Sequence, residues 1–169
     1  MAFVYFAYGS NMCEGWLKAP DRAPSAAYVA VAHLQDHALR WHKRSKDGSG
    51  KADAWYTGYE HDVVWGTLFT IADVDKPQLE KREGVGQGYH EVQVTVRRVT
   101  GIDCRAVTYV ADPDYIDDSL KPYTWYKQIV VEGARQHRLP LDYVTTVDAV
   151  ASQDDPKGGR AAKYGSLIC

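Results

Sequence analysis

The sequence has few cysteines, no residue cluster typical of a metal site and no long hydrophobic run. Its three cysteines, Cys13, Cys104 and Cys169, are an odd number at wide spacing without a Cys-x-x-Cys pair. Neither a disulfide framework nor a zinc knuckle is indicated, so we interpret all three as free thiols in a reducing compartment. The six histidines form no His-x-x-x-His or Glu-x-x-His cluster, which argues against a metal site.

No apolar stretch is long enough to span a membrane, and the amino terminus lacks a positive segment followed by an apolar run and a cleavage site. We therefore expect a cytoplasmic protein. The net charge is only -2, from 20 basic and 22 acidic residues that are interspersed along the chain. Such a balance provides no field that would favour nucleic acid or an anionic membrane, and we expect neither as a partner.

What the sequence does have is a globular composition, with 45% hydrophobic and 12% aromatic residues in a chain of 169. Strand-like segments come first and helical segments mostly late, without regular alternation. This order predicts an α+β fold with a mixed, largely antiparallel sheet that can close into a small barrel. We expect a single domain over residues 1–151, followed by a polar tail of doubtful order at 152–169.

The hydrophobic patterns place the elements more closely. Strands are expected at Val4 to Ala7, in two parts of Ala26 to Trp41, and at Ala54 to Tyr59, Val63 to Ile71, Tyr89 to Val99 and Ile102 to Val110. Helices are expected around Met12 to Lys18, from Asp73 or Asp75 to Gly84, at Tyr123 to Arg138 and at Leu141 to Ala151. Gly66 inside a strand indicates a bulge or a close backbone approach. Lys43 to Lys51 is interpreted as a polar loop with solvated charges, and anion binding is the alternative.

The first candidate site is the turn at Tyr8-Gly9-Ser10-Asn11, where the opening strand stops. Gly9, Ser10 and Asn11 are residue types that tolerate tight or left-handed backbone conformations. Such a turn can leave several backbone N–H groups unpaired and pointing one way, which suits a carboxylate or a phosphate. The alternative is a plain turn that binds nothing.

Glu83 is the strongest candidate for acid–base chemistry. A carboxylate in the last helical turn before Gly84 faces the negative end of the helix dipole, where Lys or Arg is favoured instead. If the side chain is also partly buried, its pKa rises, as a general base or proton shuttle near neutral pH requires. The alternative is an exposed Glu83 paired with Arg82 or Lys81.

Three other side chains could take part in chemistry. Tyr89 begins a strand and Tyr126 lies on the apolar face of the late helix, so their phenolic groups could reach a ligand or could simply belong to the core. Cys13 lies close to the turn and could be a nucleophile, but no residue evidently serves as its base, and a small buried thiol is the simpler interpretation.

Several segments in this order resemble the gamma-glutamylcyclotransferase family, over about Phe3 to Tyr143. They are Tyr5 to Met12, Leu79 to Val85 with Gly88-Tyr89, and Tyr126 to Val130 with Gly133-Ala134, Leu139-Pro140-Leu141 and Tyr143. The resemblance implies a small barrel with flanking helices that converts a small gamma-glutamyl compound to 5-oxoproline and a free amine or amino acid, without a cofactor. Glu83 matches the family's catalytic glutamate.

The resemblance also assigns roles around Glu83. The Tyr8 to Asn11 turn is expected to bind the glutamyl carboxylate, the oxyanion of the tetrahedral intermediate, or both. Tyr89 and Tyr126 match positions that line the family's pocket. Relatives are often dimers, and the aromatic residues Trp55, Tyr56 and Tyr59 could serve a homodimer interface or the core equally well.

The leaving group stays open at this point. Tyr-Gly-Ser-Asn resembles the branch that acts on gamma-glutamyl amino acids, but glutathione, a gamma-glutamylamine or a natural-product amide are alternatives. A non-catalytic carboxylate-binding module is a second class of function, and a hydrolase with Cys13 or Ser10 as nucleophile is a third. Residues 163–168 echo the opening motif without a strand before them, which we interpret as coincidence.

Overall fold

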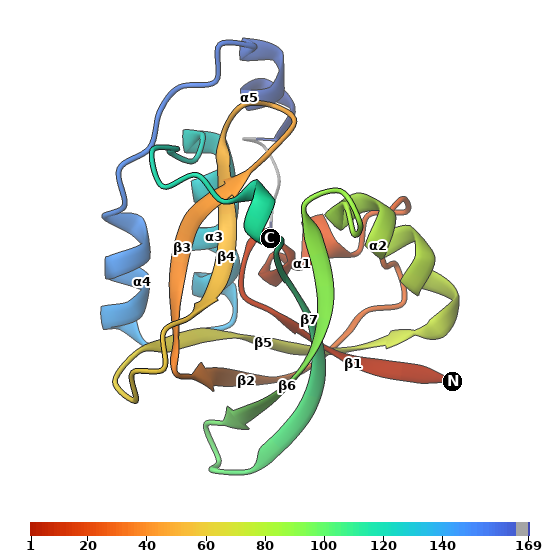
Figure 1. Cartoon of the computed structure of the whole chain (residues 1–169). Coiled ribbons are helices and arrows are strands. Elements are labelled where there is room, and N and C mark those ends of the chain that lie inside the picture. The colour runs from red at the N-terminus through yellow and green to blue at the C-terminus, as the bar shows by residue number, and fades with distance from the viewer. Residues whose placement is uncertain (165–168) are drawn as a thin grey trace.

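The computed structural model of the chain describes residues 1–164 and 169, and within them five strands close into a small barrel (Figure 1). The strands in chain order are β1 (Ala2–Ala7), β2 (Ala27–Gln35), β3 (His37–Arg44), β4 (Gly50–Tyr56), β5 (Val63–Ala72), β6 (Tyr89–Arg98) and β7 (Asp103–Ala111). The order around the barrel is β1-β5-β2-β6-β7, closed by a parallel contact of β1 with β7, while the other pairs are antiparallel. The expected α+β class with a largely antiparallel barrel is confirmed.

Helices flank the barrel on two sides in the view of Figure 1, with α3 and α4 to the left and α1 and α2 to the right. The helices are α1 (Glu14–Leu17), α2 (Lys76–Glu83), α3 (Thr124–Gln136), α4 (Leu141–Asp148) and α5 (Gly158–Tyr164), with short 3-10 turns η1 (Ser10–Met12), η2 (Asp73–Asp75) and η3 (Pro113–Tyr115). None of the described helices is long and apolar enough to cross a membrane. Helix α5 belongs to the carboxyl-terminal tail, and most of the echo of the opening motif, at 165–168, lies outside the described residues.

The hairpin of β3 and β4 forms a separate two-stranded sheet that rises from the barrel toward α5 (Figure 1). The loop expected over Lys43 to Lys51 is shorter than predicted, because Lys43 pairs with Lys51 and Arg44 with Gly50 as the strands run on. The expectation of solvated charges is confirmed for Arg44 and Lys46, which are exposed, and was wrong for Lys43 and Lys51. Lys43 is 7% exposed and the side chain of Lys51 is 15% exposed, because both pack against aromatic rings under the hairpin.

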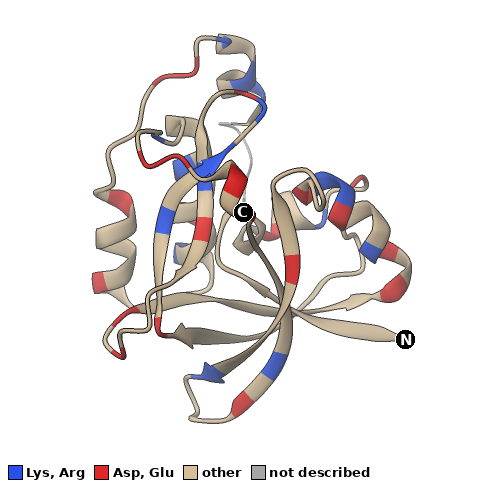
Figure 2. Ribbon diagram, viewed as in Figure 1, with Lys and Arg blue, Asp and Glu red and all other residues tan. Residues whose placement is uncertain are grey.

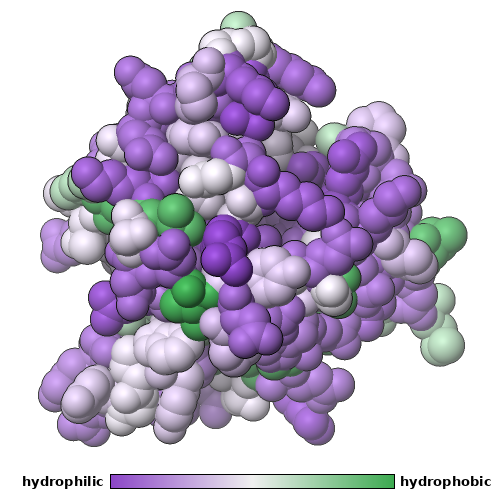
Figure 3. All heavy atoms as spheres, turned by 45° about the horizontal axis from the view of Figure 1, so that its top comes forward, coloured by the Kyte–Doolittle hydropathy of each residue, from purple (hydrophilic) through white to green (hydrophobic). Residues whose placement is uncertain are grey.

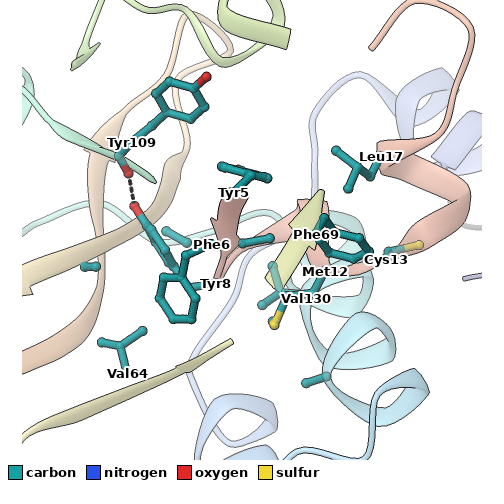
Figure 4. Close-up of a cluster of buried hydrophobic side chains, with 14 of the residues drawn as sticks. Tyr5, Phe6, Tyr8, Met12, Cys13, Leu17, Val64, Phe69, Tyr109 and Val130 are labelled. Atoms are coloured by element: carbon teal, nitrogen blue, oxygen red, sulfur yellow. Dashed lines mark hydrogen bonds between the residues drawn. The ribbon is translucent and has the colours of Figure 1, made fainter. Parts of the chain in front are cut away.

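The core lies between the barrel and α3, where Phe6, Met12 and Val130 are fully or almost fully buried (Figure 4). Strands β1 and β5 come very close at Gly66, since a Cβ atom there would lie 2.3 Å from the carbonyl oxygen of Ala7. The close backbone approach predicted from this glycine is confirmed. Tight packing of this kind fixes where β1 ends and the turn begins.

The interpretation of all three cysteines as free thiols was wrong. Cys13 and Cys169 form a disulfide with their Cα atoms 4.6 Å apart, and Cys104 is a free thiol. The tail reaches Cys13 by returning over α3, where Asp155 accepts a hydrogen bond of 2.8 Å from the indole N–H of Trp125. The paired cysteines are 156 positions apart, so their spacing in the sequence does not indicate the bond.

Candidate active site

The chain leaves β1 through a tight turn at one mouth of the barrel. The N–H of Met12 donates to the carbonyl of Gly9 at 3.1 Å, and the N–H of Cys13 donates to the carbonyl of Ser10 at 3.0 Å. These two bonds close the 3-10 turn η1. The first N–H groups of a short helix have no partner inside it, which leaves those of Ser10 and Asn11 without an acceptor within the turn.

Two tyrosines and β4 form the wall behind this turn. The N–H of Ala52 donates to the hydroxyl of Tyr126 at 3.2 Å, and the hydroxyl of Tyr89 donates to the carbonyl of Ala52 at 2.5 Å. Gly9 fits closely against this wall, because a Cβ there would lie 3.3 Å from the Ala52 side chain and 3.5 Å from the Tyr126 hydroxyl. Burial raises the pKa of both tyrosines, so both phenols stay protonated. The hydrogen of Tyr89 is donated to Ala52, whereas the hydroxyl of Tyr126 accepts from Ala52 and still has a hydrogen to donate.

Glu83 is the last residue of α2, as predicted, because Gly84 follows it in the left-handed conformation with φ of +75°. The side chain of Asn11 donates a hydrogen bond of 2.9 Å to the carboxylate, and the guanidinium of Arg22 lies 3.8 Å from the same oxygen. The Glu83 side chain is only 18% exposed. The alternative of an exposed Glu83 paired with Arg82 is therefore wrong.

The electrostatics of Glu83 differ in one respect from the sequence-based argument. Burial is the main cause that raises the pKa of Glu83, rather than its place at the helix end. The charge of Arg22, the hydrogen bond from Asn11 and the charge of Lys43 act in the opposite direction. Glu83 is therefore a carboxylate with increased proton affinity that is still held in position by a donor.

The structure brings the turn, Glu83 and the two tyrosines named from the sequence to one narrow cavity. Its lining includes Tyr8, Gly9, Ser10, Asn11, Glu83, Tyr89 and Tyr126. Tyr8 contributes its ring rather than its hydroxyl, which donates to the carbonyl of Tyr109 at 2.5 Å (Figure 4). Cys13 also lies beside the turn but has no thiol to act as nucleophile, because it is in the disulfide.

Sequence reasoning missed several residues of this region. Tyr5 and Tyr109 also line the cavity, and the Tyr5 hydroxyl accepts a hydrogen bond of 2.9 Å from Asn11. Tyr5 could have been found from its place in a strand that leads into the turn. Lys43 had a weaker sequence signal, because it lies two residues after Trp41 and so shares a face of the strand with it. In the structure both side chains contact tyrosines of the cavity wall.

An outer hollow adjoins the cavity and shares Ser10, Glu83, Tyr89 and Tyr126 with it. Basic residues predominate in its lining: Arg22, Lys43, Lys46, Lys51, Lys81 and Arg82, against Asp47 and Glu83. Figure 2 shows basic segments on the upper parts of β3 and β4 and on α2. Hydrophilic residues cover most of the face shown in Figure 3, with hydrophobic residues in small patches.

No metal site accompanies this arrangement in the described part of the chain. Residues 1–164 and 169 contain no group of three His, Cys, Asp or Glu side chains that could hold a metal ion. Larger hollows elsewhere, such as the one between α3 and α4 at Arg138 and Val144, contain neither a tight turn nor a buried carboxylate. The cavity at Glu83 is therefore the candidate active site.

Comparison with known proteins agrees with this geometry. Residues 63–147 match the AIG2-like family. The chain is 32% identical over 163 residues to the gamma-glutamylcyclotransferases of Bos taurus and Homo sapiens, covering 90% of this chain and 81% of each relative. A solved structure of a gamma-glutamyl cyclotransferase superposes with a TM-score of 0.82 at 29% identity, over 91% of this chain and 90% of that one. YkqA from Bacillus subtilis shares the fold, with a TM-score of 0.72 at 21% identity, over 90% of this chain and 56% of that one.

Proposed function

The chain belongs to the AIG2-like family, and we propose that it is a gamma-glutamylcyclotransferase. Its substrate is a small molecule in which the side-chain carboxyl of glutamate forms an amide with an amino acid or an amine. The products are 5-oxoproline and the free amine or amino acid. The reaction consumes no water and oxidises nothing, so its atom balance requires no co-reactant.

In the proposed reaction the α-amine of the glutamyl group attacks the side-chain carbonyl of the same group. At neutral pH this amine is protonated and cannot attack, so a base must remove a proton. Glu83 takes that proton and returns one to the leaving nitrogen. The ring C–N bond forms and the original amide C–N bond breaks. The raised pKa of Glu83 supports both transfers, because the carboxylate has a greater affinity for the proton it must briefly hold.

Asn11 positions the amine as well as the base. Its Nδ2 donates to Glu83, while its Oδ1 is buried and has no partner among the described residues. A buried acceptor without a donor is costly, and an N–H of the substrate's α-amine would satisfy it. The amine is thereby oriented beside the Glu83 carboxylate. The N–H groups of Ser10 and Asn11 bind the glutamyl α-carboxylate, and stabilisation of the oxyanion is a second role for the same groups.

The observation that carries this proposal is that a largely buried carboxylate and the tight turn at Gly9, Ser10 and Asn11 line one narrow cavity. A non-catalytic module would bind gamma-glutamyl ligands and release no 5-oxoproline from them. A hydrolase that used Ser10 would release glutamate instead, through a trappable acyl-enzyme. We also propose a homodimer. Tyr56 and Tyr59 are 66% and 71% exposed, which favours a surface role over a core role.

The decisive experiment is Glu83→Gln, which retains the shape of the side chain and removes the base. We expect kcat for 5-oxoproline release to fall by about 10²-fold or more, the usual contribution of an acid–base group, with an unchanged circular dichroism spectrum. Glu80→Gln is the matched control on the same helix, because Glu80 faces Lys76 at 3.8 Å rather than the cavity. Undiminished release by Glu83→Gln, measured by mass spectrometry of the product, would refute the assignment.

A further inference from the structure

Lys43 is a largely buried cation with no carboxylate within ion-pair distance among the described residues. The residue is 7% exposed, and among the described residues no carboxylate forms an ion pair with its ammonium and no acceptor takes a hydrogen bond from it. A charge that has lost part of its water and has no close partner is costly to a fold. Its presence at the edge of the candidate active site therefore calls for an anion that the chain itself does not provide.

The surroundings of Lys43 keep its ammonium in place without neutralising it. The Nζ atom lies 4.5 Å from the centroid of the Tyr89 ring and 6.0 Å from that of Tyr115. Aromatic faces stabilise a cation that has lost part of its water. Gly88 leaves the necessary room, because a Cβ there would lie 3.0 Å from Nζ and 2.7 Å from Cε of Lys43.

The two other largely buried cations of the outer hollow already have carboxylate neighbours. The ammonium of Lys51 lies 2.9 Å from Asp47, and the guanidinium of Arg22 lies 3.8 Å from Glu83. Among the described residues, Lys43 is thus the largely buried cation of this hollow that has no carboxylate within ion-pair distance and can bind one from a ligand. Lys51 adds a second positive charge nearby, but that charge is paired with Asp47.

The position of Lys43 relative to Glu83 indicates which part of a substrate it meets. Under the proposed function, on which this inference rests, the glutamyl group fills the narrow cavity and its scissile amide lies at Glu83. Glu83 and Tyr89 line both the cavity and the outer hollow. The leaving group therefore extends into the outer hollow, toward the ammonium that lies over the Tyr89 ring.

We propose that Lys43 binds a carboxylate of the leaving group in the outer hollow, and that the enzyme thereby selects gamma-glutamyl amino acids over gamma-glutamyl compounds with an uncharged leaving group. A charge-assisted hydrogen bond from a partly desolvated ammonium is among the stronger single contacts a binding site can make. Lys43 is a specificity residue in this proposal and takes no part in proton transfer.

A second role for Lys43 must be separated from this one. Its positive charge lowers the proton affinity of Glu83, so removing it would alter the base as well as the subsite. That effect applies equally to every substrate, because all substrates use the same base. A ratio of two substrates that differ only in the leaving-group carboxylate cancels it and reports the subsite alone.

The experiment compares gamma-glutamyl-alanine with gamma-glutamyl-alaninamide, in which a neutral amide replaces the terminal carboxylate. For the wild type we expect kcat/KM for 5-oxoproline release to favour the carboxylate by about 10- to 100-fold, the range for a hydrogen bond to a charged group. Lys43→Met should bring this ratio close to one, chiefly by raising KM for gamma-glutamyl-alanine, and Lys43→Arg should retain a preference. Arg44→Met is the matched control, because the neighbouring Arg44 is exposed and its guanidinium bonds the carbonyl of Asp114 outside the hollow.

Each outcome has a distinct meaning. Equal kcat/KM values for the two substrates in the wild type would overturn the inference and leave the proposed function standing, since 5-oxoproline would still be released. An unchanged preference in Lys43→Met would overturn it as well, whereas loss of the preference with a retained circular dichroism spectrum would support it. Failure of both substrates and of other gamma-glutamyl amides to yield 5-oxoproline would refute the proposed function itself. Should Lys43→Met fail to fold, the wild-type ratio and the Lys43→Arg variant still decide the question.

Discussion

At the scale of single residues, burial raises the pKa of Glu83 and three neighbouring groups lower it. Arg22 provides a charge at 3.8 Å, Asn11 provides a hydrogen bond at 2.9 Å, and Lys43 contributes from a greater distance. A general base must be deprotonated at the working pH and still attract a proton. These neighbours therefore set the pH range in which the proposed reaction runs.

Replacing Asn11 by Leu should move that range. The variant removes a hydrogen bond to the charged form of Glu83, and its loss raises the pKa of Glu83 further above its ordinary value. The deprotonated base is then populated only at higher pH, so the acid limb of kcat/KM against pH should shift upward. A pH profile of 5-oxoproline release by the two proteins measures the shift. An acid limb that stayed in place or moved to lower pH would contradict this account of Glu83.

At the scale of elements, helix α3 holds the turn in place through a direct backbone contact. A Cβ atom at Gly133 would lie 2.5 Å from the backbone N of Cys13 and 2.8 Å from the carbonyl carbon of Met12. Neither neighbouring atom belongs to a flexible side chain. The helix and the turn therefore approach as closely as they do because residue 133 has no side chain.

Gly133→Ala is expected to destabilise the protein, although alanine is the better helix former. Overpacking should lower the free energy of unfolding by about 1–3 kcal/mol and reduce activity, because α3 is pushed away from the turn that carries the N–H groups. Thermal and urea unfolding measure the loss. Gly159→Ala in α5 is the matched control, since its Cβ would meet nothing within 4 Å. Equal stability of the two variants would show that the contact of α3 with the turn is more adaptable than the structure indicates.

Elements whose sequence pattern reports burial were predicted well, and those positioned by long-range contacts were not. The helix over Tyr123 to Arg138 and its buried face were readable because apolar residues recur at helical spacing. The pattern also placed Glu83 at a helix end, because Gly84 marks it. The bond from Asn11 to Glu83 joins residues 72 positions apart and exists only because β1 and α2 meet at one mouth of the barrel. Lys43 was assigned to solvent because hydrophobic patterning cannot show a lysine that packs against Tyr89.

At the scale of the whole molecule, the carboxyl-terminal segment returns to the start of the chain. The ring of Tyr164 in α5 lies 5.1 Å from that of Trp16 and 4.9 Å from that of Trp125. The disulfide between Cys13 and Cys169 then joins the two ends of the fold. This course was not predictable, because a polar segment with one cysteine has no periodic pattern and its partners come from distant helices.

Removing this disulfide should lower stability without removing activity. A cross-link between residues 156 positions apart restricts the unfolded chain, and the loop-entropy model gives an upper value of about 5 kcal/mol for it. Cys169→Ser should therefore melt at a lower temperature, by about 2–4 °C for each kcal/mol lost, and wild-type protein should show the same decrease in dithiothreitol. Release of 5-oxoproline at 25 °C should persist in both cases, since no tail residue lines the cavity at Glu83. Cys104→Ser is the control, because the Cys104 thiol is free. This variant keeps the disulfide, so its melting temperature should still fall in dithiothreitol. If instead wild type and Cys169→Ser had the same melting temperature and neither changed in dithiothreitol, the disulfide would make no contribution to stability.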